Sequence, residues 1–220
     1  MIALDARLRC IYEAAGCCDC IADIGSDHAL LPIALLQSGK AKRAIACDVR
    51  PGPLERSRKN ALKYNIENID FVLSDGFDAL AEGSYDKAAI CGMGGILISE
   101  IIRRARSKAH CELILQPMTA YEDLRAFLWN NGFTIADERF AVDAKKPYVV
   151  IIARYAGENE RYTYSDLFLG KIRPDTAEFK AFCKKVRAQA EKRLKGALHR
   201  NLPTSDLEEL IKSCIFSEKD

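Results

Sequence analysis

The stretch that decides the fold is Ile21-Ala22-Asp23-Ile24-Gly25-Ser26-Asp27-His28-Ala29-Leu30-Leu31-Pro32. Its apolar start is typical of the end of a buried strand, and Gly25 permits a sharp turn because it has no Cβ atom. The apolar run from Ala29 to Leu36 then predicts a helix. A strand, a glycine turn and a helix start together predict a ligand site, because the free N–H groups of the first helical turn point into it.

An acidic residue further along the chain indicates the class of ligand. Asp48 follows Gly25 by about 20 residues and ends a second apolar strand, where a carboxylate accepts hydrogen bonds from ribose hydroxyls. A dinucleotide site also requires G-x-G-x-x-G, but Asp27 stands at the second glycine position and would repel a pyrophosphate. An acid there tolerates the amino and sulfonium groups of S-adenosyl-L-methionine, which is the predicted cofactor. The alternatives are an ordinary turn in another α/β protein and a nicotinamide oxidoreductase.

The composition of the 220 residues is that of a globular protein, with 49% hydrophobic and 29% charged residues. No apolar run of about 18 residues occurs, and residues 1–9 lack the apolar core of a signal peptide, so we expect a cytoplasmic protein without a membrane span. The nine cysteines lie mostly in apolar segments, which favours buried thiols over a disulfide framework. Cys17 and Cys20 have the C-x-x-C spacing of zinc sites, but no second pair accompanies them, so we predict a loop and no metal.

Hydrophobic periodicity alternates between two types of element as far as residue 155. We expect helices at 4–15, 29–38, 51–64, 96–106 and 120–130, and strands at 20–24, 43–48, 70–73, 85–91, 111–115, 133–142 and 147–155. This order predicts an α/β fold with a mostly parallel sheet and helices on both faces. Only a short turn, residues 143–146, joins the last two strands, so they should form an antiparallel hairpin. The arrangement resembles the class I methyltransferase variant of the Rossmann fold.

Polar and glycine residues gather where the predicted strands end. In open α/β sheets ligands bind beyond the carboxyl ends of the strands, so these residues should lie on one rim. The predicted cofactor-binding residues are Asp23, Gly25, Ser26, Asp48, Val49, Ser74, Asp75, Gly76 and Cys91. The same rim should carry Asp27 and His28, the turn from Gly92 to Gly95, and Gln116-Pro117.

The pattern changes after residue 155. Residues 157–164 are polar and have no strand period, and a helix start follows with Asp175 as the expected N-cap and Glu178 three residues later. Apolar residues then recur at helical spacing to residue 197, and Ser205 with Glu208 predicts the capping box of a second helix. Two amphipathic helices joined by a short turn predict an antiparallel helical hairpin.

Positive charge is concentrated in the first of these two helices. The net charge is only +2, but eight basic residues lie between residues 180 and 200 with Glu191 as the one acid. They are Lys180, Lys184, Lys185, Arg187, Lys192, Arg193, Lys195 and Arg200. Such a cluster predicts a surface that follows phosphates, with Lys184, Lys185 and Arg187 as RNA-binding candidates. Arg7, which projects from the first helix, is a further candidate; the alternative for all of them is a solvated helix face.

Three motifs together resemble one family. Ala22-Asp23-Ile24-Gly25-Ser26-Asp27-His28-Ala29, Gly92-Met93-Gly94-Gly95 and Leu115-Gln116-Pro117 are similar to motifs of the bacterial tRNA adenine-22 N1-methyltransferases. The resemblance covers about residues 1–155 and implies methyl transfer from S-adenosylmethionine to N1 of adenine 22 in tRNA. It also implies a coiled-coil-like tail and no obligate protein partner. We therefore expect a methyltransferase domain at 1–157 and a C-terminal helical hairpin at 158–220.

The chemistry of adenine N1 assigns roles to the rim. N1 has a lone pair, so the enzyme mainly has to align N1, the methyl carbon and the sulfur. An Asn-Pro-Pro-Tyr type motif, as in methylases of exocyclic amines, is absent, which favours a ring nitrogen. The predicted catalytic residues are Asp27, His28, Gly92, Met93 and Gly94, and the predicted substrate contacts are Gly95, Gln116 and Pro117. The alternatives are a methyltransferase for another RNA or small molecule, and a non-catalytic RNA-binding protein with the same fold.

Overall fold

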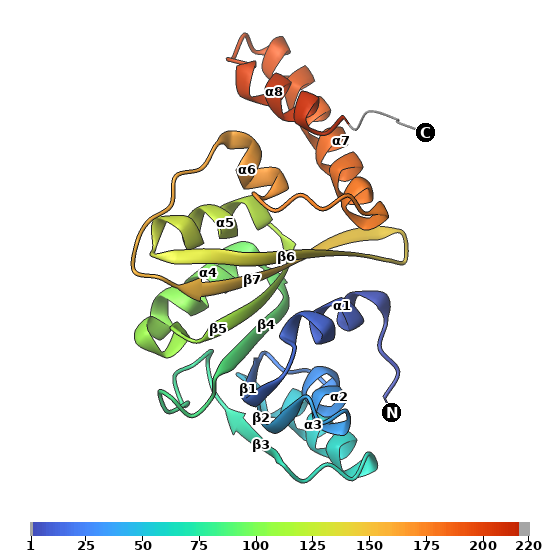
Figure 1. Ribbon diagram of the computed structural model, residues 1–220, viewed down its shortest axis with the longest axis vertical. Coiled ribbons are helices and arrows are strands. Elements are labelled where there is room, and N and C mark those ends of the chain that lie inside the picture. The colour runs from blue at the N-terminus through green and yellow to red at the C-terminus, as the bar shows by residue number, and fades with distance from the viewer. Residues whose placement is uncertain (1, 216–220) are drawn as a thin grey trace.

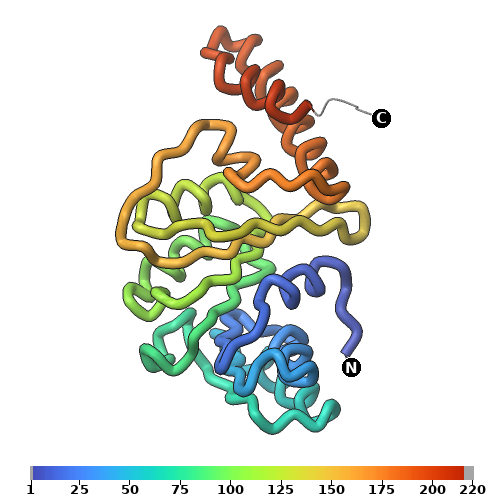
Figure 2. The backbone as a smooth tube through the Cα atoms, in the orientation of Figure 1, coloured from blue at the N-terminus to red at the C-terminus, as the bar shows by residue number. Residues whose placement is uncertain are grey.

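The computed structural model describes residues 2–215, and its centre is one seven-stranded sheet (Figures 1 and 2). The strands are β1 (Cys18–Ile24), β2 (Ala41–Asp48), β3 (Ile69–Leu73), β4 (Lys87–Gly94), β5 (Glu112–Thr119), β6 (Phe133–Asp143) and β7 (Lys146–Tyr155). Their order in the sheet is β3-β2-β1-β4-β5-β7-β6. The first five strands in this order are parallel, and β7 runs antiparallel to both of its neighbours. The predicted fold class and the closing hairpin are therefore confirmed.

Helices cover both faces of the sheet because successive side chains of a strand point to opposite sides. One layer contains α1 (Ala6–Ala15), α2 (Leu30–Gln37) and α3 (Pro51–Lys63), and the other contains α4 (Gly95–Ala105), the 3₁₀ turn η1 (Arg106–Ala109) and α5 (Tyr121–Asn130). On β5, for example, Ile114 joins the first layer while Leu113 and Leu115 join the second. Among the described helices, none is both long and apolar enough to cross a membrane.

Strands β4 and β5 run further at their carboxyl ends than the sequence predicts. Gly92 to Gly94 was expected to be a turn, but it continues β4, and β5 continues from Gln116 to Thr119 instead of ending at residue 115. The two extensions pair with each other, with register irregularities around Met93. Glycine and proline are tolerated in strands at such irregularities. The pairing depends on two segments far apart in the sequence, so local composition misses it.

The C-terminal region contains one helix that the sequence analysis missed. Helix α6 (Tyr164–Leu169) falls in and after the segment expected to be polar and irregular, and it begins with a capping box formed by Thr163 and Asp166. Two longer helices, α7 (Ala177–His199) and α8 (Ser205–Ser213), form the predicted hairpin and project past β6 at one end of the molecule (Figure 1).

Both predicted helix starts in this hairpin are wrong in detail. The N-cap of α7 is Thr176, whose side chain accepts a hydrogen bond from the N–H of Phe179, and not Asp175. Helix α8 follows Thr204, and the Thr204 hydroxyl donates to the Glu208 carboxylate at 2.8 Å, so Ser205 and Glu208 form no capping box. In both cases the neighbouring threonine takes the N-cap position.

Aromatic packing joins the hairpin to the sheet. Phe140 of β6 lies 4.8 Å from Phe179 and 5.1 Å from Phe182, measured between ring centroids. The same buried cluster extends to Leu210 of α8. The division of the chain at residues 157 and 158 stays a prediction, and residues 216–220 of the predicted hairpin lie outside the described residues.

Candidate active site

A cavity of about 540 Å³ lies beyond the carboxyl ends of β1, β2 and β4. It brings together most of the residues predicted from the sequence. The predicted residues that line it are Arg7, Asp23, Gly25, Asp27, Asp48, Val49, Ser74, Asp75, Gly76, Cys91, Gly92 and Met93. Within residues 2–215 the lining does not include Ser26, His28, Gly94, Gly95, Gln116, Pro117, Lys184, Lys185 or Arg187.

The glycine turn after β1 is tightly held. Gly25 has a φ of 75°, and a Cβ atom added there would lie 2.1 Å from Cε of Met93. The N–H of Ser26 donates to the Cys47 carbonyl at 2.7 Å, and the Ser57 hydroxyl donates to the Ser26 carbonyl at 3.2 Å. Ser26 is therefore buried as a support of the turn, while Gly25 leaves the backbone open to the cavity.

Two carboxylates are nearly buried on the floor of the cavity. Asp23 is 8% exposed and Asp48 is 7% exposed. The pKa of Asp23 is raised to about 6, mainly by burial and to a smaller extent by the negative charge of Asp48. The carboxylate of Asp48 accepts the N–H of Arg50 at 2.8 Å, which fixes its direction. Next to it Val49 is 60% exposed, so an apolar surface and two acceptors face the same space.

The loop after β3 is held by its own side chains. The Ser74 hydroxyl donates to the Gly76 carbonyl at 2.9 Å and accepts the N–H of Ala79 at 3.0 Å. Asp75 accepts two hydrogen bonds from Arg104, at 2.7 and 2.8 Å, and these lower the pKa of its carboxyl group. Ser74 therefore shapes this wall of the cavity, and Arg104 orients the Asp75 carboxylate.

Asp27 and His28 differ in their placement. Oδ1 of Asp27 accepts hydrogen bonds from Nε and a terminal nitrogen of Arg56 at 3.1 and 2.9 Å, and Nε2 of His28 lies 3.6 Å from the same oxygen. His28 has a left-handed φ of 69°, as does Ala29 with 50°, so α2 begins only at Leu30. Asp27 therefore lines the cavity, whereas His28 lies next to Asp27 and does not line it.

Arg7 reaches the cavity from the first helix. Its guanidinium donates to Oε1 of the fully buried Gln116 at 2.9 Å, and Nε2 of Gln116 donates to the Pro117 carbonyl at 2.9 Å. Across from it Gly92 has a φ of 78°, and a Cβ atom there would lie 3.9 Å from Arg7. Gln116, which is itself held by the Pro117 carbonyl, therefore fixes the position of Arg7. The sequence analysis did not predict this contact between distant segments.

Two neighbouring glycines at the start of α4 have different surroundings. Gly94 is the N-cap, and a Cβ atom there would lie 3.3 Å from Oγ1 of Thr119. At Gly95 a Cβ atom would lie 2.1 Å from the Ala120 carbonyl oxygen, so this glycine packs against backbone away from the cavity. Residues missed by the sequence analysis include Leu97, which lines the cavity and is 48% exposed. The only local signal for Leu97 is that it is an apolar residue in the first turn of α4.

The predicted RNA-binding residues of α7 differ in burial and in their partners. Lys185 is half-buried, with Nζ 5.6 Å from the ring centroid of Tyr121, and burial lowers its pKa. Arg187 pairs with Glu191 at 2.8 Å. Lys184 is exposed. Only Lys184 of these three therefore points to solvent without a close acidic neighbour.

Within residues 2–215 no group of three or more His, Cys, Asp or Glu side chains is arranged to hold a metal ion. All nine cysteines lie in the described range and are free thiols, including Cys17 and Cys20.

The chain is similar to known methyltransferases over most of its length. A family model described as a methyltransferase domain matches residues 4–151. The tRNA (adenine(22)-N(1))-methyltransferase of Bacillus subtilis (strain 168) is 30% identical over 174 residues, which are 78% of this chain and 73% of that protein.

Two solved structures share the whole architecture. Sp1610 of Streptococcus pneumoniae, in complex with S-adenosyl-L-methionine, is 30% identical with a TM-score of 0.83, and the match covers 96% of this chain and 100% of that one. TrmK of M. capricolum, in complex with S-adenosyl-homocysteine, is 25% identical with a TM-score of 0.80 and 96% coverage of both chains. The chain described here belongs to the tRNA (adenine(22)-N(1))-methyltransferase family.

Proposed function

We propose that this protein is an S-adenosylmethionine-dependent methyltransferase that methylates N1 of adenine 22 in tRNA. The observation that carries the proposal is the cavity, in which Asp23, Asp48 and Val49 face one space in a chain of this family. A tRNA substrate also supports a cytoplasmic location for the activity. The Bacillus subtilis relative carries this activity in its name, and structures of relatives hold the cofactor and its product.

The residues of the cavity fit this cofactor. S-adenosylmethionine supplies an electrophilic methyl group on a positively charged sulfur. The fixed Asp48 carboxylate suits ribose hydroxyls, and exposed Val49 offers an apolar surface to the adenine ring. Asp23 adds a negative charge that favours a cationic ligand, and Gly25 lets the ligand approach the backbone.

The opposite wall suits the target base. Because N1 of adenine has its own lone pair, positioning is the main task of the protein there. Gly92 leaves room beside the sheet, Leu97 offers an apolar surface, and Arg7 is held in place by Gln116. Asp27, oriented by Arg56, is the candidate acceptor for the adenine amino group. Adenine 22 lies in folded tRNA, so the base has to leave its stack to enter this space.

Methylation of a defined transcript tests the proposed function. The protein is incubated with methyl-labelled S-adenosylmethionine and an unmodified tRNA transcript, and with a transcript in which guanine replaces adenine 22. We expect label on adenine 22 of the first transcript and none on the second. Equal labelling of both would assign the enzyme to another RNA position, and no labelling of either would contradict tRNA methylation.

Cofactor affinity should depend on pH through Asp23. Its pKa of about 6 in the folded protein means that the carboxyl group changes from mostly protonated near pH 5 to mostly ionised near pH 7. A cationic ligand prefers the ionised form, so affinity for S-adenosylmethionine should rise about tenfold over this range. Titration calorimetry at both pH values measures the change. Asp23→Asn should flatten it, and an equally steep profile in this variant would assign the dependence to another group.

The raised pKa of Asp23 also predicts how the stability of the ligand-free protein depends on pH. Because the folded-state pKa lies above the usual value of 3.8, the folded protein binds more protons than the unfolded chain between these values. The contribution of Asp23 to the free energy of unfolding therefore decreases as pH rises from about 4 to 6. Urea unfolding at several pH values should show a smaller decrease in Asp23→Asn than in the parent.

Three lysines on one face of α7 form the surface proposed to bind tRNA. Lys184, Lys192 and Lys195, here named the α7 basic face, are all exposed. Lys192 and Lys195 follow Lys184 by about two and three helical turns, so the three side chains point in similar directions. Lys185 is half-buried over Tyr121, and the exposed Arg187 is paired with Glu191, so neither is included.

Changing the α7 basic face to alanine should weaken tRNA binding about tenfold at physiological salt. Each phosphate contact contributes about −0.9 to the log–log slope of affinity against salt, so the slope should become flatter by about two to three units. Filter binding at several salt concentrations measures both quantities. A matched control changes Lys42, Lys59 and Lys63, which are exposed on β2 and α3, and should keep the parental slope. Equal slopes in the two triple variants would make the α7 basic face ordinary solvated surface.

A further inference from the structure

A fully buried ion pair lies outside the cavity. Arg125 of α5 and Glu138 of β6 have side chains with no solvent exposure, and Nε of Arg125 donates to Oε1 of Glu138 at 2.8 Å. Neither residue lines the cavity. The proposed reaction therefore gives this pair no direct role.

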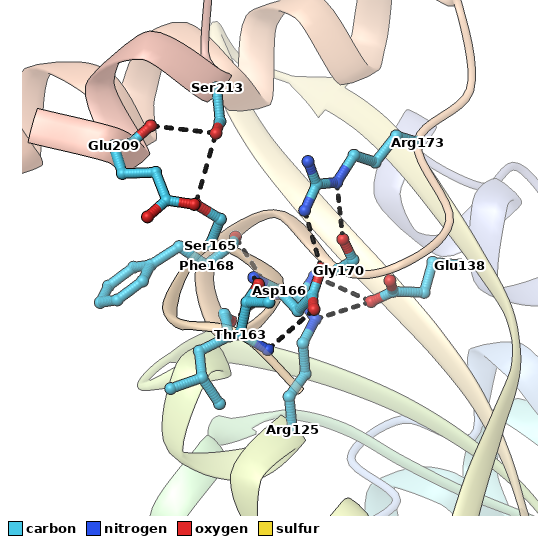
Figure 3. Close-up of polar contacts among 11 residues, drawn as sticks. Arg125, Glu138, Thr163, Ser165, Asp166, Phe168, Gly170, Arg173, Glu209 and Ser213 are labelled. Atoms are coloured by element: carbon cyan, nitrogen blue, oxygen red, sulfur yellow. Dashed lines mark hydrogen bonds and ion pairs between the residues drawn. The ribbon is translucent and has the colours of Figure 1, made fainter. Parts of the chain in front are cut away.

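The pair holds the end of α6. A terminal nitrogen of Arg125 donates to the carbonyls of Leu167 and Phe168 at 2.8 and 3.1 Å, which are in the last turn of this helix (Figure 3). Gly170 comes next, and a Cβ atom there would lie 1.7 Å from Oε2 of Glu138. The chain leaves α6 directly against the ion pair, and its path toward α7 starts from that point.

A second layer of contacts surrounds this exit. Arg173 donates from Nε to the Gly170 carbonyl at 2.9 Å and from a terminal nitrogen to Asp166 at 2.8 Å. On the other side of α6, the hydroxyl oxygens of Ser165 and Ser213 of α8 lie 3.3 Å apart (Figure 3). Helix α6 is thus fixed both to the sheet and to the hairpin. We name Arg125, Glu138, Asp166, Gly170 and Arg173 the α6 joint.

Stability alone does not account for a buried ion pair. Removing two charges from water costs several kcal/mol per ion, and apolar residues of similar volume often give equal or greater stability. The planar guanidinium of arginine, however, donates in fixed directions. At Arg125, Nε donates to Glu138 and one terminal nitrogen donates to two carbonyls of α6, so the pair holds the last turn of that helix in a fixed direction.

We propose that the α6 joint positions the α7–α8 hairpin, so that tRNA held on the α7 basic face presents its target base to the cavity. The inference rests on the proposed function. A substrate bound at one place and reacting at another requires a fixed distance between the two, because small misplacement of reacting atoms slows a reaction strongly. The joint supplies that fixed geometry, and its members are positioning residues.

The double variant Arg125→Met/Glu138→Leu tests this role without leaving a lone buried charge. We expect unchanged or greater resistance to urea, affinity for S-adenosylmethionine within twofold of the parent, and tRNA affinity within threefold. The single-turnover methylation rate at saturating tRNA should fall at least tenfold. Hydrogen exchange should increase in residues 164–176 and stay parental in residues 18–48. A merely structural role would lower the urea midpoint and leave the rate of the folded protein unchanged.

Two further variants keep the test decisive. Arg173→Gln removes the outer contacts and leaves no buried charge, so it should fold and lower the single-turnover rate about threefold; if the double variant does not fold, this result decides. Arg139→Gln removes an exposed ion pair with Asp137 next to Glu138 and should behave as the parent. Parental rates in folded joint variants would overturn the proposal. A parent protein that does not methylate tRNA would instead overturn the proposed function, and the positioning role with it.

Discussion

Gly95→Ala should destabilise the protein by about 3 kcal/mol or more and remove most of its methylation activity. A Cβ atom at this position would lie 2.1 Å from the carbonyl oxygen and 2.8 Å from the carbonyl carbon of Ala120. Both are backbone atoms, and Ala120 has a left-handed φ of 54° between β5 and α5. Relief of the clash therefore requires α4 to move away from the sheet, together with the cavity residue Leu97. Urea unfolding and single-turnover methylation measure the two effects.

The adjacent glycine provides the matched control. A Cβ atom at Gly94 would lie 3.3 Å from the Thr119 hydroxyl, which is a side chain, and the φ of Gly94 is −70°. Gly94→Ala should therefore cost less than about 1 kcal/mol. Equal stability of the two variants would show that the start of α4 adapts freely and that the close contact of Gly95 is not needed.

Asp48→Ala should weaken S-adenosylmethionine binding by about 1.5–3 kcal/mol, which is roughly 10- to 150-fold in affinity. The carboxylate is nearly buried and already oriented by the N–H of Arg50, so it can make charge-assisted hydrogen bonds without prior ordering. Asp48→Asn keeps one acceptor and should lose less. Titration calorimetry on the folded variants measures the affinities.

A second aspartate near the same strands is the control for this prediction. Asp70 of β3 is exposed and pairs with Arg43 at 3.2 Å, outside the cavity. Asp70→Ala should bind S-adenosylmethionine as the parent does. Parental affinity of Asp48→Ala would remove Asp48 from the cofactor site.

The cavity could be predicted well from the sequence where it depends on strand ends. Gly25 and Asp48 lie at such ends, and the fold brings strand ends together whatever lies between them. Gly92 to Gly94 was assigned wrongly to a turn, because its pairing with residues 116–119 is a contact between distant segments. Helix α6 has only six residues, too few for a periodic pattern, although its capping box at Thr163 and Asp166 was a readable signal.

The basic cluster of α7 is a second case in which contacts between distant segments could not be predicted from the sequence. Helical spacing predicts which residues share a face, but it does not show what that face meets. Lys185 packs over Tyr121 of α5 and lies 3.5 Å from the Pro147 carbonyl of β7. Arg193 pairs with Glu122 of α5 at 3.2 Å. These partners belong to other elements, so the sequence alone does not show which basic residues of α7 have partners within the protein.

The order of the last two strands has a consequence for synthesis on the ribosome. β7 lies between β5 and β6, so β6 has no place in the sheet until residue 155 has left the exit tunnel. Helix α1, made first, packs on α2 and β5 and also on β6 and β7, so part of its apolar side waits uncovered until the last two strands are made. Arg7 meets Gln116 through that same helix. The nascent protein thus acquires its cofactor wall early, and the helix that carries Arg7 is fully packed only after β6 and β7 have been made.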